Sequence, residues 1–197
     1  LVLTRGHVLL FDYVESVGSV SGVEALPLEM APAFDDYGDR RIVVFVTHSH
    51  DDHYSPSVFE WRAKHPGIQY VLGSPLAGQG KTTRVMIPHE DWSSGGLRVR
   101  TTGSTDEGVG FLVTVDGITI FHAGDHAVWS DSSTEAFERE IQWLKTQGTS
   151  IDLAFFPIAT GFACEPRPSI WKGVKTAGLE LHPRVLIPMH VRCASQL

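Results

Sequence analysis

The sequence predicts an α/β fold in a single domain that spans residues 1–197. Short apolar, β-branched runs typical of buried strands alternate along the chain with amphipathic helical segments. Three of the apolar runs are followed closely by histidine or aspartate: 42–46 by His48, 118–121 by Asp125, and 185–187 by His190. A chain of 197 residues with 42% hydrophobic and 20% charged residues is large enough for one domain with a sizeable core.

The first half of the chain is expected to contain three strands and one clear helix. Residues 14–41 are rich in Gly, Pro, Ser and acidic residues, and we expect a long loop there with one short helix near 24–30. Ser55 and Pro56 have the residue types of an N-cap and first helical position, and Pro66 should end that helix. The expected strands are 8–13, 42–46 and 69–72.

The second half should begin with a strand at 85–87 and a loop at 88–96, in which His89 is expected to be solvated. Asp116 and Gly117 separate two apolar runs, which is a strong signal for a β-hairpin. Residues 134–146 have the spacing of an amphipathic helix that ends at Gln147 and Gly148. The remaining expected elements are strands at 97–101, 111–115, 118–121, 152–156 and 185–187, and a helix at 169–177.

The stretch from His48 to His53 has the strongest chemical signal. It reads His-Ser-His-Asp-Asp-His directly after a buried strand. Imidazole nitrogen and carboxylate oxygen are the donors that bind zinc and similar divalent ions. His48 and His50 are alternate residues, so in an extended chain both would point to one face and hold one ion. The alternative is a polar loop whose histidines only hydrogen-bond to the backbone.

These residues resemble the signature of the metallo-β-lactamase-fold hydrolases, His-x-His-x-Asp-His after a strand. Gly124-Asp125 and the stretch from Ile187 to His190 match two later motifs of that family. The resemblance implies a four-layer αββα sandwich with two mixed sheets and outer helices. It also implies that Asp12 lies beneath the metal site, although a surface turn is an equal alternative. The metal ligands that it implies are His48, His50, Asp52, His53, Asp125 and His190.

One position departs from the family pattern. Where the family commonly has Gly-His-Thr, this chain has Gly103-Ser104-Thr105, and serine is a poor zinc ligand. The site must therefore be a two-metal site with an altered first position or a single-metal site. Asp125 with a water could complete the first position, and His122 or His126 are weaker alternatives because neighbouring residues at a strand end face apart.

The resemblance implies a hydrolase in which a hydroxide held by metal attacks an ester, lactone or phosphodiester-type bond. We expect one or two divalent ions, zinc first, with manganese or iron as alternatives, and Asp52 as the residue that orients the nucleophile or transfers its proton. The motifs are most similar to the compact branch that includes ascorbate-6-phosphate lactonase-like proteins. Two further hypotheses are a non-catalytic metal-binding protein, because of Ser104, and an iron oxidoreductase, against which the lack of a flavin motif or cysteine cluster argues.

The net charge of −7 argues against a nucleic-acid or anionic-membrane partner, since both need basic surface. No apolar run approaches the ~20 residues of a membrane span. We therefore expect a small-molecule substrate and a cytoplasmic location. Tyr54, Trp129 and Phe162 could contact that substrate, or could equally serve packing.

Overall fold

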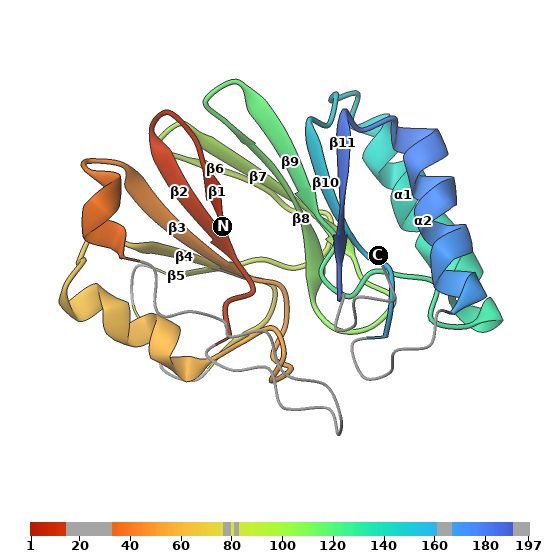
Figure 1. Ribbon diagram of the computed structural model, residues 1–197, viewed down its shortest axis with the longest axis horizontal. Helices are drawn as coiled ribbons and strands as arrows, with labels where there is room; N and C mark the ends of the chain where they lie inside the picture. Colours follow the sequence, from red (N-terminus) through yellow and green to blue (C-terminus); the bar gives the residue numbers. More distant parts are fainter. Residues whose placement is uncertain (15–32, 77–79, 81–82, 161–166, 191–197) are drawn as a thin grey trace.

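Two β-sheets pack face to face in the computed structural model, which describes residues 1–14, 33–76, 80, 83–160 and 167–190 (Figure 1). The first sheet has the strand order β1-β2-β3-β4-β5. Its short β1 is antiparallel to β2, and the other neighbouring strands are parallel. The strands are β1 (Val2–Leu3), β2 (His7–Phe11), β3 (Arg41–Val46), β4 (Gln69–Leu72) and β5 (Thr83–Val85).

The second sheet has the order β11-β10-β9-β8-β7-β6. The strands from β6 to β9 are antiparallel neighbours, whereas β9, β10 and β11 are parallel. Both sheets are therefore mixed, as predicted. The strands are β6 (Asp91–Ser94), β7 (Leu97–Gly103), β8 (Val109–Val115), β9 (Ile118–His122), β10 (Leu153–Pro157) and β11 (Val185–Met189).

Helices cover the outer face of each sheet. The 3-10 helices η1 (Phe34–Tyr37) and η2 (Pro56–Ala63) lie outside the first sheet. Outside the second sheet lie α1 (Thr134–Thr146), which follows the short 3-10 helix η3 (Asp131–Ser133), and α2 (Pro168–Leu181). The predicted four-layer αββα arrangement is confirmed.

Strand β3 shows how the sequence fills the spaces between layers. Val43 and Phe45 belong to the core between the two sheets, and Val44 and Val46 belong to the core beneath η1 and η2. Successive side chains of a strand point to opposite faces, so an entirely apolar strand can serve two cores. The last apolar residue is Val46, and the chain then leaves the sheet at its edge.

The Asp116-Gly117 hairpin and the helix at 134–146 are confirmed. The predicted loop at 88–96 is wrong, because β6 pairs there with β7 across Gly95 and Gly96, whose positive φ angles suit a two-residue hairpin turn. The helix predicted at 169–177 continues to Leu181 and ends where His182 adopts a left-handed conformation, so Gly178 does not stop it. The segment at 56–63 is a 3-10 helix, and Ser55 makes no side-chain capping bond to it.

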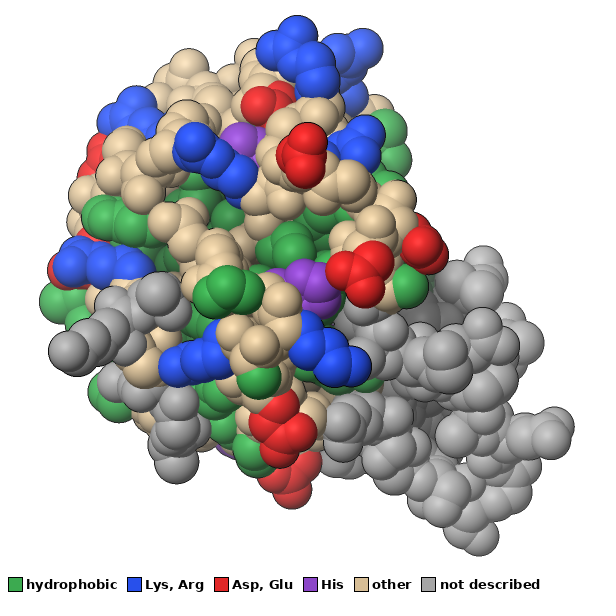
Figure 2. All heavy atoms as spheres, turned by 90° about the vertical axis from the view of Figure 1, so that its left-hand side faces the viewer, with side chains coloured by type: hydrophobic (Ala, Val, Ile, Leu, Met, Phe, Trp, Pro, Cys, Tyr) green, Lys and Arg blue, Asp and Glu red, His purple; other side chains and the backbone are tan. Residues whose placement is uncertain are grey.

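The predicted helix near 24–30 and Phe162 lie outside the described residues. Within the described ranges, no helix combines the length and the apolar character needed to cross a membrane. On the face that bears η1 and η2, cationic and anionic side chains are interspersed (Figure 2).

Candidate metal centre

The ends of four strands bring the predicted ligands to one edge of the sandwich (Figure 1). Strand β2 is followed by Asp12, β3 by Thr47 and the histidine cluster, β9 by the segment to Asp125, and β11 by His190. Parallel neighbours within each sheet end on the same side, so residues far apart in sequence meet there. Asp12 and His190 both have positive φ angles, 45° and 59°, which are uncommon for residues other than glycine and concentrate at functional sites.

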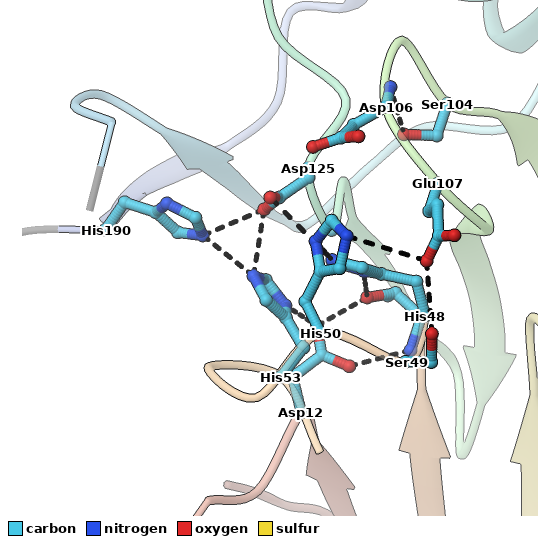
Figure 3. A network of polar contacts seen from close by, with 12 residues as sticks. Asp12, His48, Ser49, His50, His53, Ser104, Asp106, Glu107, Asp125 and His190 are labelled. Carbon is cyan, nitrogen blue, oxygen red and sulfur yellow. Dashed lines mark hydrogen bonds and ion pairs between the residues drawn. The ribbon is translucent and has the colours of Figure 1, made fainter. Parts of the chain in front are cut away.

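Asp125, His53 and His190 form a compact triangle of donor atoms (Figure 3). Asp125 Oδ1 lies 2.9 Å from Nε2 of His53 and 2.9 Å from Nε2 of His190, and the two nitrogens are 3.0 Å apart. Oδ1 of Asp125 is buried and makes no hydrogen bond of acceptable geometry. One carboxylate oxygen and two imidazole nitrogens that converge in this way fit a divalent cation by the chemistry of the donor set.

Asp52 approaches the same group from the loop after β3. A carboxylate oxygen of Asp52 and ring nitrogens of His53 and His190 lie within 4.8 Å of one another. The Asp52 side chain is half-buried, so it borders both the donor triangle and the solvent. The structure thus brings four of the six predicted ligands together around Asp125 and His190.

His48 is fully buried and faces the other oxygen of Asp125, with Nε2 3.7 Å from Oδ2. Thr47 Oγ1 lies 2.9 Å from His48 Nδ1 and donates its own proton to Asp12, so it can accept from Nδ1–H. In this neutral tautomer, Nε2 carries a lone pair that can bind a cation or accept a hydrogen bond. His50 Nδ1 lies 3.0 Å from His48 Nε2, so the two rings are neighbours as predicted, but His50 is exposed.

Asp12 lies beneath the candidate metal centre, and its side chain is only 6% exposed, so the surface-turn alternative is wrong. Its carboxylate accepts hydrogen bonds from Thr47 N (2.7 Å), Thr47 Oγ1 (2.7 Å) and His53 Nδ1 (2.8 Å). Burial opposes ionisation, but attraction to His53 and these hydrogen bonds lower the pKa of Asp12. Metal-binding histidines commonly donate their second ring N–H to a carboxylate, which fixes the orientation of the ring.

The two carboxylates around His53 make this position favourable for positive charge. Burial lowers the pKa of His53, but Asp12 and Asp125 outweigh it and raise the pKa to about 10. The imidazoles of His190 and His53 in turn hold the pKa of Asp125 well below its usual range, against the effect of burial. The converging donor atoms of His53, His190 and Asp125 therefore attract either a proton or a metal cation.

The two histidines that flank Asp125 in sequence do not join the cluster. His122 is buried against Phe11, with ring centroids 4.9 Å apart and planes at 6°, and burial lowers its pKa to about 4. His126 is fully buried against Phe137, with centroids 4.6 Å apart and neither ring nitrogen hydrogen-bonded. Neither belongs to a group of converging metal donors among the described residues.

His89 is exposed in the turn before β6, as predicted, but it also contacts α1. Its Nε2 lies 2.8 Å from Oε2 of Glu140 on α1, and its ring stacks on Trp143 with centroids 4.7 Å apart. Glu140 is buried and also accepts a 2.8 Å hydrogen bond from Gly103 N, at the end of β7.

Trp129 donates Nε1–H to the Asp125 carbonyl oxygen at 2.9 Å, so its indole has a packing and positioning contact beside the donor cluster.

Sequence reasoning missed two carboxylates, Asp106 and Glu107, in the loop between β7 and β8. Oxygens or nitrogens of His50, Asp106 and Asp125 lie within 4.8 Å of one another. Glu107 Oε2 lies 3.6 Å from His50 Nε2 and accepts a hydrogen bond from Ser49 Oγ at 3.1 Å. The sequence contains a signal for them, because both residues follow within three positions of Ser104, where the family commonly has a metal-binding histidine.

Three glycines enclose Thr47, the residue that precedes the histidine cluster. A Cβ atom at Gly73 or Gly108 would overlap the Thr47 carbonyl oxygen, and one at Gly124 would lie 2.8 Å from Thr47 Cβ. Gly108 and Gly124 also have positive φ angles, 69° and 56°. Three loops can therefore approach the end of β3 closely only because these positions lack side chains.

Comparisons with known proteins agree with this geometry. The family model described as "Beta-lactamase superfamily domain" matches residues 1–190. A "UPF0173 metal-dependent hydrolase" of Nitratidesulfovibrio vulgaris Hildenborough is 31% identical over 175 residues, which are 82% of this chain and 67% of that protein. Another from Symbiobacterium thermophilum is 28% identical over 188 residues, 87% of this chain and 72% of that protein. The chain spans about two thirds of the length of the N. vulgaris relatives.

Solved structures share the fold at low sequence identity. Igni18, a metallo hydrolase from Ignicoccus hospitalis, has a TM-score of 0.58 at 20% identity, over 83% of this chain and 70% of that chain. CmlA, a diiron β-hydroxylase from Streptomyces venezuelae, has a TM-score of 0.56 at 16% identity, over 95% of this chain and 42% of that chain. The fold, the edge position of the donor cluster and the family match agree: this chain belongs to the beta-lactamase superfamily.

Proposed function

We propose that this protein is a metal-dependent hydrolase that cleaves an ester, lactone or phosphodiester-type bond in a small molecule. The observation that carries the proposal is the buried triangle of Asp125, His53 and His190, with donor atoms 2.9–3.0 Å apart. The description of its relatives as metal-dependent hydrolases supports it. The net charge of −7 favours a small substrate over a nucleic acid.

His53, His190 and Asp125 would hold one ion, with zinc as the first choice and manganese or iron as alternatives. A bound divalent ion supplies Lewis acidity and lowers the pKa of a bound water toward ~7. Asp12 keeps the His53 ring oriented through the 2.8 Å contact to Nδ1. Asp52 borders the same donors, so its carboxylate can take a proton from the attacking water and return it to the leaving group.

Within the superfamily, we place the chain nearest the lactonase-like proteins, on the strength of the Ser104 to Phe111 and Ile187 to His190 stretches. A lactone is therefore the first of the three bond types to assay. The assay should include all three bond types.

The test is hydrolysis by metal-reconstituted protein on a panel of carboxylic esters, lactones and phosphodiesters, with Asp52→Asn as the variant. We expect the variant to keep its melting temperature and to lose about 10²–10⁴-fold in kcat, the usual contribution of general acid–base catalysis. Asp51→Asn changes an adjacent exposed aspartate and should keep full turnover. Near wild-type hydrolysis by Asp52→Asn would remove Asp52 from this role.

The second candidate is a non-catalytic metal-binding protein, which the replacement of the third histidine by Ser104 favours. Stoichiometric metal in the purified protein with no turnover on any part of the panel would support it. Turnover that disappears with a chelator and returns with metal would support the hydrolase.

A further inference from the structure

The loop between β7 and β8 has Ser104 at the position of the family's histidine, and it carries a carboxylate, Asp106, two residues further on. Asp106 projects from this loop toward the side of Asp125 that is turned away from His190 (Figure 3). Donor atoms of Asp106, His50 and Asp125 lie within 4.8 Å of one another. This group shares Asp125 with the His53 and His190 triangle but otherwise uses different side chains.

Ser104 has a structural task in the loop. Its Oγ accepts a hydrogen bond from Asp106 N at 3.2 Å, a local turn typical of serine. The serine thus fixes the backbone of Asp106 and leaves the carboxylate to face the site.

The β7–β8 loop is hydrogen-bonded to the two segments that carry the site, the one after Asp125 and the one before His48. Thr105 Oγ1 donates to the Ala127 carbonyl oxygen at 2.7 Å and accepts from Ala127 N at 2.9 Å, just after Asp125. Val109 N donates to the Thr47 carbonyl oxygen at 3.3 Å, just before His48. The tight approach of Gly108 to Thr47 leaves little room for the loop to shift. Asp106 is therefore held over His50 by backbone and threonine contacts.

The two carboxylate oxygens of Asp125 face different neighbours. Its Oδ1 faces His53 and His190, and its Oδ2 lies on the side of His48. The side chain is only 8% exposed, and Oδ1 is buried without a hydrogen bond. A buried carboxylate is costly unless cations or donors surround both oxygens, which a pair of ions would achieve.

We propose that Asp106, with His50 and Asp125, forms a second divalent-cation site that replaces the missing third histidine. The inference rests on the proposed function for the first ion. With two carboxylates and one imidazole, the second site has harder donors than the first and should accept manganese(II) well. The exposed positions of His50 and Asp106 make this the weaker and more exchangeable site.

The test is direct metal binding by protein stripped with a chelator, measured by calorimetry and by electron paramagnetic resonance during titration with MnCl₂. We expect the wild-type chain to bind two ions with separate affinities and to show magnetic coupling between them. Asp106→Asn should keep the tighter ion and weaken the second by about 100-fold, since loss of even an outer-shell partner costs about 10–100-fold. Asp51→Asn, which removes an exposed charge beside His50, should bind both ions within about threefold of wild type.

Glu107→Gln tests the competing carboxylate in the same loop. Loss of the second ion in Glu107→Gln but not in Asp106→Asn would overturn the assignment, and so would two unchanged ions in Asp106→Asn. A wild-type chain that binds one ion and hydrolyses its substrate would refute the second site but leave the proposed function standing. A chain that binds no ion would refute both.

Discussion

Asp12 and His53 are joined by a 2.8 Å contact between Oδ2 and Nδ1, on the side of the ring opposite the Nε2 that faces Asp125. The same Asp12 carboxylate accepts two hydrogen bonds from Thr47. One side chain thereby fixes both the end of β3 and the orientation of the imidazole that faces Asp125. The orientation of His53 is consequently set before any ligand arrives.

Replacing Asp12 with Asn should weaken metal binding by about 10–100-fold, because the neutral amide supports the His53 ring less well. Asn tolerates the positive φ of this position, so the backbone should keep its course. Calorimetric titration with zinc would measure the change, with the exposed Asp39→Asn as control. Equal affinity in Asp12→Asn and the control would contradict the role assigned to this contact.

Removal of the Glu140 carboxylate should destabilise the junction between α1 and β7. Glu140→Ala leaves Gly103 N and His89 without the partner that each has at 2.8 Å, at an expected cost of about 1–3 kcal/mol in the free energy of unfolding. Urea denaturation would measure it. Glu138→Ala, at an exposed position of the same helix, should change stability by less than about 0.5 kcal/mol. Similar losses in both variants would count against the contact.

Asp116 should give the fold a pH-dependent contribution. It accepts hydrogen bonds from Thr4 Oγ1 (2.5 Å), His7 Nδ1 (3.0 Å) and Gly6 N (2.8 Å), which connect the β8–β9 turn with the β1–β2 turn. These bonds, the one from Thr4 first, hold its pKa well below the usual 3.8. Since the folded-state pKa is lowered, the stabilisation is complete above the unfolded-state pKa and is lost as the pH falls through the folded-state pKa.

The corresponding variant is Asp116→Asn, which can keep the positive φ of the turn. Its melting temperature should lie below that of wild type at pH 7, and the difference should shrink below about pH 4. Asp39→Asn should show no such pH-dependent difference. A gap between Asp116→Asn and wild type that stays constant down to about pH 2 would refute the argument.

His126 should prove dispensable for metal binding. Its ring is fully buried against Phe137, and neither ring nitrogen is hydrogen-bonded. Replacing a buried, unsatisfied polar ring with an apolar ring of similar shape is close to neutral or stabilising. We therefore expect His126→Phe to retain its metal content by elemental analysis and its melting temperature. Loss of one equivalent of metal in His126→Phe would instead identify His126 as a ligand.

The sequence predicts the strands that end at the site well, because each is an apolar run that stops at a polar residue. It also predicts the convergence of His53, Asp125 and His190 through the family motif. It does not predict β6, since the polar strand Asp91–Ser94 has no apolar pattern and depends on pairing with β7. Asp106 escaped prediction for a related reason: an acidic loop residue becomes a candidate ligand only when tertiary contacts bring it beside His50.

The glycines around Thr47 separate the shape of the site from its chemistry. Gly73, Gly108 and Gly124 determine how closely three loops approach Thr47, whereas Asp106 and Glu107 supply carboxylates on one of those loops. The β7–β8 loop can thus carry different side chains while its backbone keeps the same approach to Thr47. Changing those side chains would alter which cation is preferred. A methyl group at Gly108, in contrast, would overlap the Thr47 carbonyl oxygen and displace the loop that carries them.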